Sequence, residues 1–364
     1  MKILQVITSL WTGGAEKLVV QLTHALKERG HSVDVALFDG TKTDLKEELE
    51  KSGCRIFSFS QGGSMYSPRY IFKLRRLMKG YDMVHTHNSS PQLFAALANV
   101  FRKRPVLVTT EHSTFNRRRE RWYFRPLNKW MYGKYSATVC ISRIAYDKLV
   151  SYLGKTTKIQ IINNGADIAA LSAAEPGRGI RKENEKHVVV MVAALREGKD
   201  QETLIRAVAT MPEDYCLWLV GDGQRRSLLE ALASQLKVED RVRFFGWRTD
   251  IPAILKSADV VAMASHYEGL SLSSIEGMAV GKPFIASDVD GLREIVSGAG
   301  VLVPDSDSRA FAQKIQELCI DTEYAARVAS LCGQRAAQFD FRNMVEAYDN
   351  LYRGLEQEWK RKNS

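Results

Sequence analysis

The stretch from Asp259 to Glu294 constrains the fold of this chain more than any other part of the sequence. It opens with an apolar run, DVVAMA, which predicts a buried strand. A Ser-rich turn then leads into an apolar-periodic segment that ends at Gly281-Lys282-Pro283, and a glycine with a proline beyond it is typical of a helix end. A second strand, PFIAS, follows. The stretch therefore predicts a strand–loop–helix–strand unit of a parallel α/β sheet.

Two glutamates flank the predicted loop, and seven residues separate Glu268 from Glu276. Glu268 is expected at the carboxyl end of the strand, where open α/β sheets bind their ligands. The loop would present backbone N–H groups at a helix N-terminus, which suits an anion. The alternative is that Ser273 to Glu276 form only a capping box and that Glu268 is a solvated loop residue. The spacing alone leaves both interpretations open.

The segment resembles the E-x7-E motif of retaining glycosyltransferases of family GT4, which have the GT-B fold. The similarity extends to YEGL, to the run E-G-M-A-x-G-K-P-x-I-A-S and to D-G-L-x-E. The resemblance implies that Glu268 contacts the donor sugar and that Glu276 contacts the nucleotide ribose. It also implies that the donor diphosphate is held by the backbone of Gly269, Leu270, Ser271 and Leu272.

Length and composition fit two globular domains. The chain has 364 residues, of which 45% are hydrophobic and 26% are charged, as in ordinary globular proteins. No apolar stretch approaches the roughly 18 residues of a membrane span, and the N-terminal MKILQVITSL predicts a first strand and not a signal peptide. The five cysteines contain no CxxC pair, so neither a zinc site nor a disulfide framework is expected. These features favour a cytoplasmic protein.

The charge is unevenly distributed along the chain. The first 168 residues carry 27 Lys and Arg against 13 Asp and Glu, whereas the remainder carries 25 against 29. Two segments, Arg69–Lys79 and Arg117–Lys134, mix basic with apolar or aromatic residues, which predicts peripheral contact with an anionic membrane surface on its inner face. The alternatives are a solvated basic face or a soluble anionic acceptor. No nucleic-acid module is recognisable, so no nucleic-acid partner is expected.

The N-terminal segment predicts a βαβ unit. Lys2–Thr8 is expected as a strand, followed by a turn at Gly13 and Gly14 and a helix over Glu16–Arg29. The turn is not G-x-G-x-x-G, and we expect no acidic residue at the ribose position at the end of the second strand, which disfavours a dinucleotide oxidoreductase. On their own the two glycines indicate turn chemistry. The resemblance implies that this turn approaches the donor diphosphate.

Three histidines of the first half lie in the predicted strands MVHTH and PVLVTTEH. His85 and His87 alternate along MVHTH, but no carboxylate or cysteine accompanies them at metal-ligand spacing, so we expect a structural role and no metal. His112 ends the strand PVLVTTEH. By itself it is expected to be a satisfied core or edge residue. The resemblance implies a place in the cleft beside the donor sugar.

Basic residues follow the first strand of the second half. Arg196 and Lys199 lie in the predicted loop after HVVVMV, where they are either ordinary loop charges or a cationic clamp for a leaving diphosphate. Lys199 matches the position of the family lysine. Ala194 stands where the family usually has an arginine, so Arg196 is the candidate substitute on the other side of Leu195.

The resemblance implies two Rossmann-like α/β domains that face each other across a cleft. We expect an acceptor-binding domain over 1–168, a linker over 169–185, a nucleotide-sugar-binding domain over 186–340 and a C-terminal helix over 341–364 that packs back on the first domain. The implied reaction transfers a sugar from a nucleotide-diphosphate sugar to a glycan acceptor, expected to be lipid-linked, in cell-surface polysaccharide or glycolipid synthesis. Anomeric configuration is retained and neither a metal nor a cofactor is required. A nucleotide-sugar epimerase on the same fold and a non-catalytic membrane or nucleic-acid adaptor are the alternatives.

Overall fold

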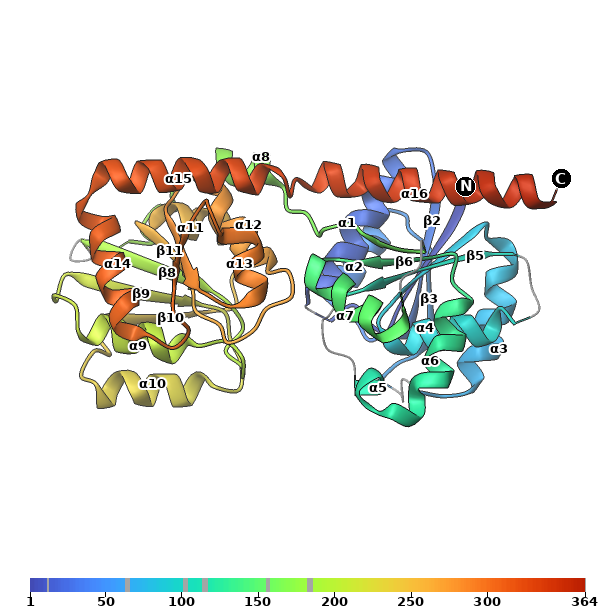
Figure 1. Cartoon of the computed structure of the whole chain (residues 1–364), viewed down its shortest axis with the longest axis horizontal. Helices are drawn as coiled ribbons and strands as arrows, with labels where there is room; N and C mark the ends of the chain where they lie inside the picture. Colours follow the sequence, from blue (N-terminus) through green and yellow to red (C-terminus); the bar gives the residue numbers. More distant parts are fainter. Residues whose placement is uncertain are drawn as a thin grey trace. The chain divides into compact units, whose positions relative to one another are not determined.

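The chain consists of two compact units, each built on a parallel sheet with helices on both faces (Figure 1). A computed structural model describes residues 1–11, 13–62, 66–100, 104–112, 117–154, 158–181 and 186–363. The first unit comprises Met1–Asn164 and Asn343–Ser364, and the second comprises Gly165–Arg342. The predicted α/β fold class is confirmed. The segment 169–185, for which we expected a linker, falls within the second unit, where helix α8 (Ile168–Ala173) forms its start.

The first unit contains a seven-stranded sheet in the order β3-β2-β1-β4-β5-β6-β7. Its five central strands are buried on both faces and rich in branched residues, as expected for a parallel sheet, whereas the two edge strands are only partly buried. Between β1 and β4 the direction of winding reverses, which makes this the topological switch point. The strands are β1 (Lys2–Ile7), β2 (Ser32–Asp39), β3 (Ile56–Ser60), β4 (Met83–His87), β5 (Val106–Glu111), β6 (Ala137–Cys140) and β7 (Ile159–Ile161).

Helices connect these strands and cover the sheet. Helix α1 begins two residues before the predicted start because Gly13 already takes the N-cap position. The helices of this unit are α1 (Gly14–Glu28), α2 (Asp44–Lys51), α3 (Arg69–Leu77), α4 (Ser89–Ala98), α5 (Arg117–Glu120), α6 (Arg125–Gly133) and α7 (Arg143–Leu153), with short 3₁₀ turns at Met78–Gly80 and Trp122–Phe124.

The second unit contains a six-stranded parallel sheet in the order β10-β9-β8-β11-β12-β13, which reverses between β8 and β11. Its strands are β8 (His187–Val192), β9 (Tyr215–Val220), β10 (Val242–Gly246), β11 (Val260–Met263), β12 (Phe284–Ser287) and β13 (Val301–Val303). Besides α8, its helices are α9 (Gln201–Ala209), α10 (Arg226–Gln235), α11 (Ile251–Ser257), α12 (Leu272–Ala279), α13 (Asp290–Val296), α14 (Ser308–Ile320) and α15 (Thr322–Ala337).

The last helix, α16 (Phe341–Asn363), packs on the first unit, as predicted. Tyr348 and Tyr352 are fully buried there. The two carboxylate oxygens of Glu356 accept hydrogen bonds from one guanidinium nitrogen of Arg104 at 2.7 and 2.9 Å, and the guanidinium lies 3.7 Å from the centre of the Trp359 ring. A charge-assisted pair and a cation–π contact thus hold the chain end in place. None of the helices in the described parts of the chain is both long and apolar enough to cross a membrane.

Candidate active site

In the second unit, two loops at the topological switch point carry the predicted catalytic pair. Lys199 lies in the loop after β8 and Glu268 in the loop after β11, and these strands are hydrogen-bonded neighbours. Ligands of open α/β sheets bind at the carboxyl ends of the strands on either side of such a point. The structure therefore brings together two residues that are 69 positions apart in the sequence.

Lys199 and Glu268 form an ion pair between Nζ and Oε1, and only 10% and 11% of the two side chains are exposed. The Ser265 hydroxyl lies 3.0 Å from Glu268 Oε1 and 2.9 Å from the carbonyl oxygen of Gly198, so its single proton is shared between two acceptors. The pair keeps both charges compensated in a largely dry setting. An ammonium has three protons, so Lys199 can donate to a further anion while it holds the carboxylate.

Backbone hydrogen bonds fix the two loops to each other. The Asp200 amide donates to the Ala264 carbonyl at 3.0 Å, and the His266 amide donates to the Gly198 carbonyl at 3.0 Å. Ser265 is fully buried between them. The ion pair is thus held by rigid main chain on both sides, which limits the movement of its charges.

The N-terminus of α12 lies directly after Glu268. Ser271 is the N-cap residue, and its hydroxyl accepts a hydrogen bond from the Ser274 amide at 3.4 Å. The capping box over Ser273 to Glu276, which we considered as the alternative, is therefore wrong, because the helix begins two residues earlier than that box requires. Glu276 lies one turn inside the helix and is half-buried.

Gly291 is a residue of this site that the sequence did not single out. A Cβ atom at Gly291 would lie 2.3 Å from the Glu268 carbonyl oxygen and 2.5 Å from that of Gly269. No real side chain tolerates such contacts with backbone, so the first turn of α13 approaches the Glu268 loop only because residue 291 is a glycine. The D-G-L-x-E run, which contains Gly291, was the sequence signal that could have identified this residue. Ser265, which holds Glu268, was also missed.

In the first unit, a chain of imidazoles occupies the switch point. His87 on β4 lies 2.8 Å from the Gln5 side-chain oxygen on β1 through Nε2, and 2.8 Å from His112 through Nδ1. His85 lies 2.6 Å from the Tyr352 hydroxyl and 2.8 Å from the Thr110 hydroxyl. Both nitrogens of His85 and of His87 therefore have hydrogen-bond partners, which is the structural role that we expected for these two residues.

Burial keeps these histidines neutral. It lowers the pKa of His112 to about 4, and it holds the pKa values of His85 and His87 well below the ordinary imidazole range. The Nδ1 atom of His112 is buried and has no hydrogen-bond partner in the described structure. His112 thus has a neutral imidazole with one ring nitrogen that is unpaired within the described structure.

The Gly13-Gly14 turn leads from β1 into α1. Gly13 has an extended backbone, and a Cβ atom there would lie 2.3 Å from the Glu16 carboxylate. Burial raises the pKa of Glu16, against hydrogen bonds from its own amide and from Asn88. The turn after β1 and the turn after β4 therefore meet at the same edge of the sheet.

The predicted site residues thus form two groups, which the structure describes within separate units. The first unit holds Gly13, Gly14 and His112, and the second holds Arg196, Lys199, Glu268, Gly269, Leu270, Ser271, Leu272 and Glu276.

Comparison with known proteins identifies the family to which both units belong. The family model "Glycosyltransferase Family 4" matches residues 12–170, and the model "Glycosyl transferases group 1" matches residues 177–330. The chain belongs to the GT4-type, group 1 glycosyltransferases.

Individual relatives agree with this assignment. The chain is 28% identical to the putative glycosyltransferase EpsD of Bacillus subtilis over 90% of both chains. It is 27% identical to an Escherichia coli protein named UDP-Gal:alpha-D-GlcNAc-diphosphoundecaprenol alpha-1,3-galactosyltransferase, over 74% of this chain and 73% of that one. Anabaena Alr3699/HepE, crystallised with UDP-glucose, superposes with a TM-score of 0.84 at 24% identity over 97% of this chain and all of that one. That likeness shows the GT-B fold.

Two predicted cations of this glycosyltransferase differ in their surroundings. Lys199 is buried and paired, whereas Arg196 is exposed. The turn after β9 supports the loop that carries Arg196, because the Leu195 amide donates a hydrogen bond to the Asp222 carbonyl at 3.0 Å. A Cβ atom at Gly223 (φ +159°) would lie 2.3 Å from the Leu195 carbonyl oxygen, so this support also depends on a glycine.

The basic and aromatic segment Arg117–Lys134 divides into an internal and an external part. Arg118 donates to the Ser89 carbonyl at 2.8 Å, and Arg119 pairs with Glu111 at 3.4 Å with a side chain only 9% exposed. These two arginines fasten the segment to the first unit, so they are not free surface charges. The Arg117 side chain lies outside the described residues.

Proposed function

We propose that this glycosyltransferase moves a sugar from a nucleotide-diphosphate sugar to a glycan acceptor, with retention of anomeric configuration, in the synthesis of a cell-surface polysaccharide or glycolipid. The observation that carries the proposal is the Lys199–Glu268 pair beside the N-terminus of α12, at the switch point of the second unit. A cation and helix-terminal amides suit a diphosphate, and a carboxylate suits sugar hydroxyls.

A uridine-diphosphate sugar is the first donor to test. The name of the Escherichia coli relative specifies UDP-Gal, and the Anabaena protein was crystallised with UDP-glucose. In this chain the backbone of Gly269 to Leu272 would hold the diphosphate, and Glu276 would face the ribose. The turn at Gly13 and Gly14 and the neutral imidazole of His112 are the corresponding candidates in the first unit.

Lys199 and Arg196 would stabilise the leaving diphosphate as its negative charge develops. Preorganised cations can supply electrostatically what a metal ion supplies in other transferases. We assign Glu268 to positioning the donor sugar and not to nucleophilic attack. On this mechanism activity persists after exhaustive EDTA treatment, and Lys199→Ala weakens binding of the nucleoside diphosphate. Loss of activity on chelation that Mg²⁺ or Mn²⁺ restores would overturn the metal-free mechanism.

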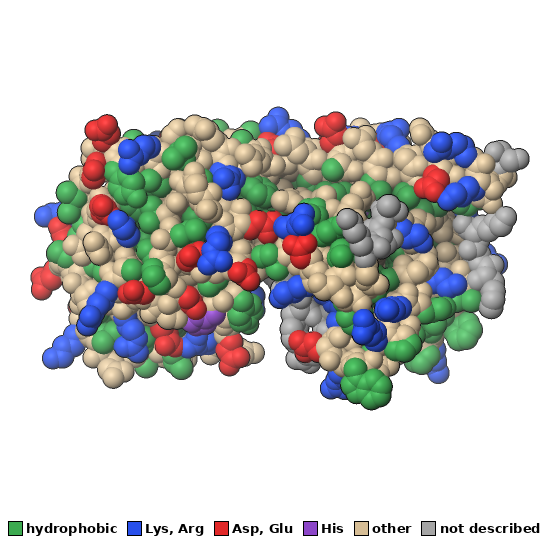
Figure 2. Space-filling view, in the orientation of Figure 1, with side chains coloured by type: hydrophobic (Ala, Val, Ile, Leu, Met, Phe, Trp, Pro, Cys, Tyr) green, Lys and Arg blue, Asp and Glu red, His purple; other side chains and the backbone are tan. Residues whose placement is uncertain are grey.

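The acceptor is proposed to be lipid-linked and presented at the inner face of a membrane. The name of the Escherichia coli relative includes a diphosphoundecaprenol acceptor. The external part of Arg117–Lys134 contains Trp122, 84% exposed, and Tyr123, 51% exposed, among basic residues. Figure 2 shows basic and hydrophobic side chains interspersed where α5 and α6 lie. Anionic lipid attracts each nearby Lys or Arg by about 1 kcal/mol.

Liposome co-sedimentation at low salt tests the membrane contact. The protein is expected to pellet with vesicles that contain anionic lipid and to stay in solution with neutral ones. The variant with Arg121, Arg125 and Lys129 all changed to Ser should remain in the supernatant, because all three residues are exposed. Arg118 and Arg119 are left in place, since their internal contacts support the fold.

A matched control carries three Arg→Ser changes at exposed positions of the second unit, Arg206, Arg309 and Arg327. This control should pellet like the wild type. Equal recovery of the wild type with both kinds of vesicle would leave a soluble acceptor as the better proposal.

The donor is identified by a thermal-shift screen against nucleotide sugars, since a ligand that binds only the folded state stabilises it by about 2.7 kcal/mol at 100 times its Kd. The donor that binds is then incubated with and without acceptor, and the product is analysed by NMR. Transfer with a retained anomeric centre supports the proposal. Conversion of the donor sugar without any acceptor would indicate the epimerase, and absence of binding by every nucleotide sugar would indicate an adaptor.

A further inference from the structure

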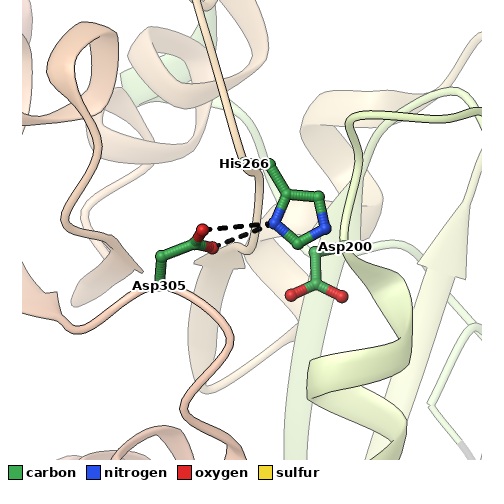
Figure 3. A group of neighbouring side chains, drawn as sticks. All are labelled: Asp200, His266 and Asp305. Carbon is green, nitrogen blue, oxygen red and sulfur yellow. Dashed lines mark hydrogen bonds and ion pairs between the residues drawn. The ribbon is translucent and has the colours of Figure 1, made fainter.

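Three side chains that the proposed reaction does not use converge in the second unit. Asp200 precedes α9, His266 lies in the loop after β11, and Asp305 lies in the loop after β13 (Figure 3). One potential ligand atom from each residue lies within 4.8 Å of those from the other two. His266 Nδ1 is 3.1 and 3.3 Å from the two carboxylate oxygens of Asp305. Asp200 is buried, whereas the other two are exposed, so the group opens to solvent on one side.

Asp200 has an oxygen atom that lacks a partner within the described structure. Its Oδ1 atom caps α9 by accepting a hydrogen bond from the Thr203 amide at 3.2 Å. Its Oδ2 atom is buried and receives no hydrogen bond, and the residue is only 5% exposed to solvent. A buried carboxylate oxygen without a donor is costly, and a protein usually compensates it with a hydrogen bond, a cation or water. The imidazole of His266 and the carboxylate of Asp305 lie beside the Asp200 carboxylate, with one potential ligand atom of each within 4.8 Å of an Asp200 oxygen.

We propose that Asp200, His266 and Asp305 bind a divalent transition-metal ion of the Zn²⁺ class. Zn²⁺ binds imidazole nitrogen and carboxylate oxygen at about 2.0–2.2 Å, which places ligand atoms roughly 3 to 4 Å apart in a tetrahedral site. The His266–Asp305 distances already fit that range. Three protein ligands leave the fourth position to water from the open side. An imidazole in the set favours Zn²⁺ over Ca²⁺ and Mg²⁺, which prefer ligand sets made only of oxygen.

The ion would join three loops of the second unit that approach one another at the carboxyl edge of its sheet. Asp200 follows Lys199 in the chain, and His266 follows Ser265, which holds Glu268. Neither Lys199 nor Glu268 belongs to the ligand set. The ion would therefore cross-link the loops that carry the ion pair, and it would not be the counter-ion of the leaving diphosphate. The inference therefore stands whether or not the proposed donor is correct.

Calorimetric titration of the EDTA-treated, dialysed protein with ZnCl₂ tests the site without any substrate. The wild type is expected to bind one Zn²⁺ that three single variants weaken at least tenfold, namely Asp200→Asn, His266→Gln and Asp305→Asn. Asparagine at position 200 keeps an oxygen for the cap of α9, so that variant is expected to fold. Zn²⁺ should raise the melting temperature of the wild type and should raise that of the variants much less.

The matched control is His24→Gln, because His24 is a partly exposed histidine that also pairs with an acid, Glu48 at 3.4 Å, in the first unit. It should bind Zn²⁺ like the wild type. Wild-type affinity in all three variants, or no binding by the wild type at millimolar Zn²⁺, would overturn the proposal. Failure of the nucleotide-sugar screen would leave this result unaffected, since the metal alone is the probe.

Discussion

The two units share one plan but place opposite chemistry at their switch points. In the first, the buried imidazoles of His85 and His87 and the half-buried imidazole of His112 are neutral and have uncharged hydrogen-bond partners. In the second, the charged pair of Lys199 and Glu268 lies between two loops. The same parallel topology therefore fixes where a ligand can bind but not the electrostatics of the site, which depend on which side chains end the central strands.

The two switch points also differ in how they are completed. The Lys199–Glu268 pair is supported by loops of its own unit, through Ser265 and Gly291. The imidazole network instead takes Tyr348 and Tyr352 from α16, a helix at the far end of the chain. The first unit thus depends on contacts of very long sequence separation, and its integrity can be tested separately from that of the second.

Lowering the pH should strongly reduce the stability of the first unit towards unfolding. The pKa of His112 is about 4 in the folded protein against an ordinary value of 6.5, so between these pH values the unfolded chain binds a proton that the folded chain does not. The free energy of unfolding is therefore highest above pH 6.5. It falls by about 3 kcal/mol for this residue alone as the pH falls towards 4. Urea unfolding followed by hydrogen exchange of β4 and β5 measures it. Unchanged protection of these strands from pH 7 to 4.5 would contradict the neutral network.

Removing the Asp349 carboxylate of α16 should destabilise the first unit and leave the stability of the second unit unchanged. Asp349 accepts hydrogen bonds from His31 and Arg353, each at 2.8 Å, and is 6% exposed. Asp349→Ala leaves these donors without their acceptor, which costs about 2–3 kcal/mol. Hydrogen exchange should rise in α16 and β2 while β8 and β11 stay protected. The control Glu346→Ala changes an exposed residue of the same helix and should have no effect.

Neutralising the carboxylate of the second unit should affect catalysis. Glu268→Gln keeps the size of the side chain and its contact with Ser265 but removes the charge that holds Lys199. Turnover is expected to fall at least about tenfold, or roughly 1.4 kcal/mol of transition-state stabilisation. The control Glu202→Gln breaks an ion pair with Arg225 in the same unit and should keep its activity. Wild-type turnover of the Glu268 variant would refute the assignment.

The smallest effect is expected for the exposed cation. Arg196→Gln should weaken binding of the nucleoside diphosphate less than about fivefold, because an exposed charge contributes at most about 1 kcal/mol. Lys199→Ala should weaken it considerably more. Calorimetry with the two variants measures both effects under one set of conditions. A larger loss for the arginine would show that Arg196, and not Lys199, is the principal contact of the diphosphate.

The sequence alone determined the fold class and the strand–loop–helix unit around Glu268 and Glu276. Both follow from local signals, because apolar periodicity, helix ends and turn glycines involve residues that are close in the sequence. The packing of the last helix on the first unit was instead an expectation from the family resemblance. The sequence also placed His85 and His87 in structural roles, from the lack of accompanying ligands at metal spacing. The family motif then supplied the candidate roles of Lys199 and His112.

Only the tertiary structure decided which of these residues meet. The pairing of Lys199 with Glu268 depends on β8 and β11 being neighbours, and strand order is not encoded in either segment. The structure also places the cap of α12 at Ser271 and not at Ser273, and it brings Gly291 against the backbone of Glu268 and Gly269. Arg118 and Arg119 point inward because folding brings the Ser89 carbonyl and the Glu111 carboxylate within their reach. Side chains compete for the few buried partners that the packed chain provides, and that competition is resolved only when distant segments come together.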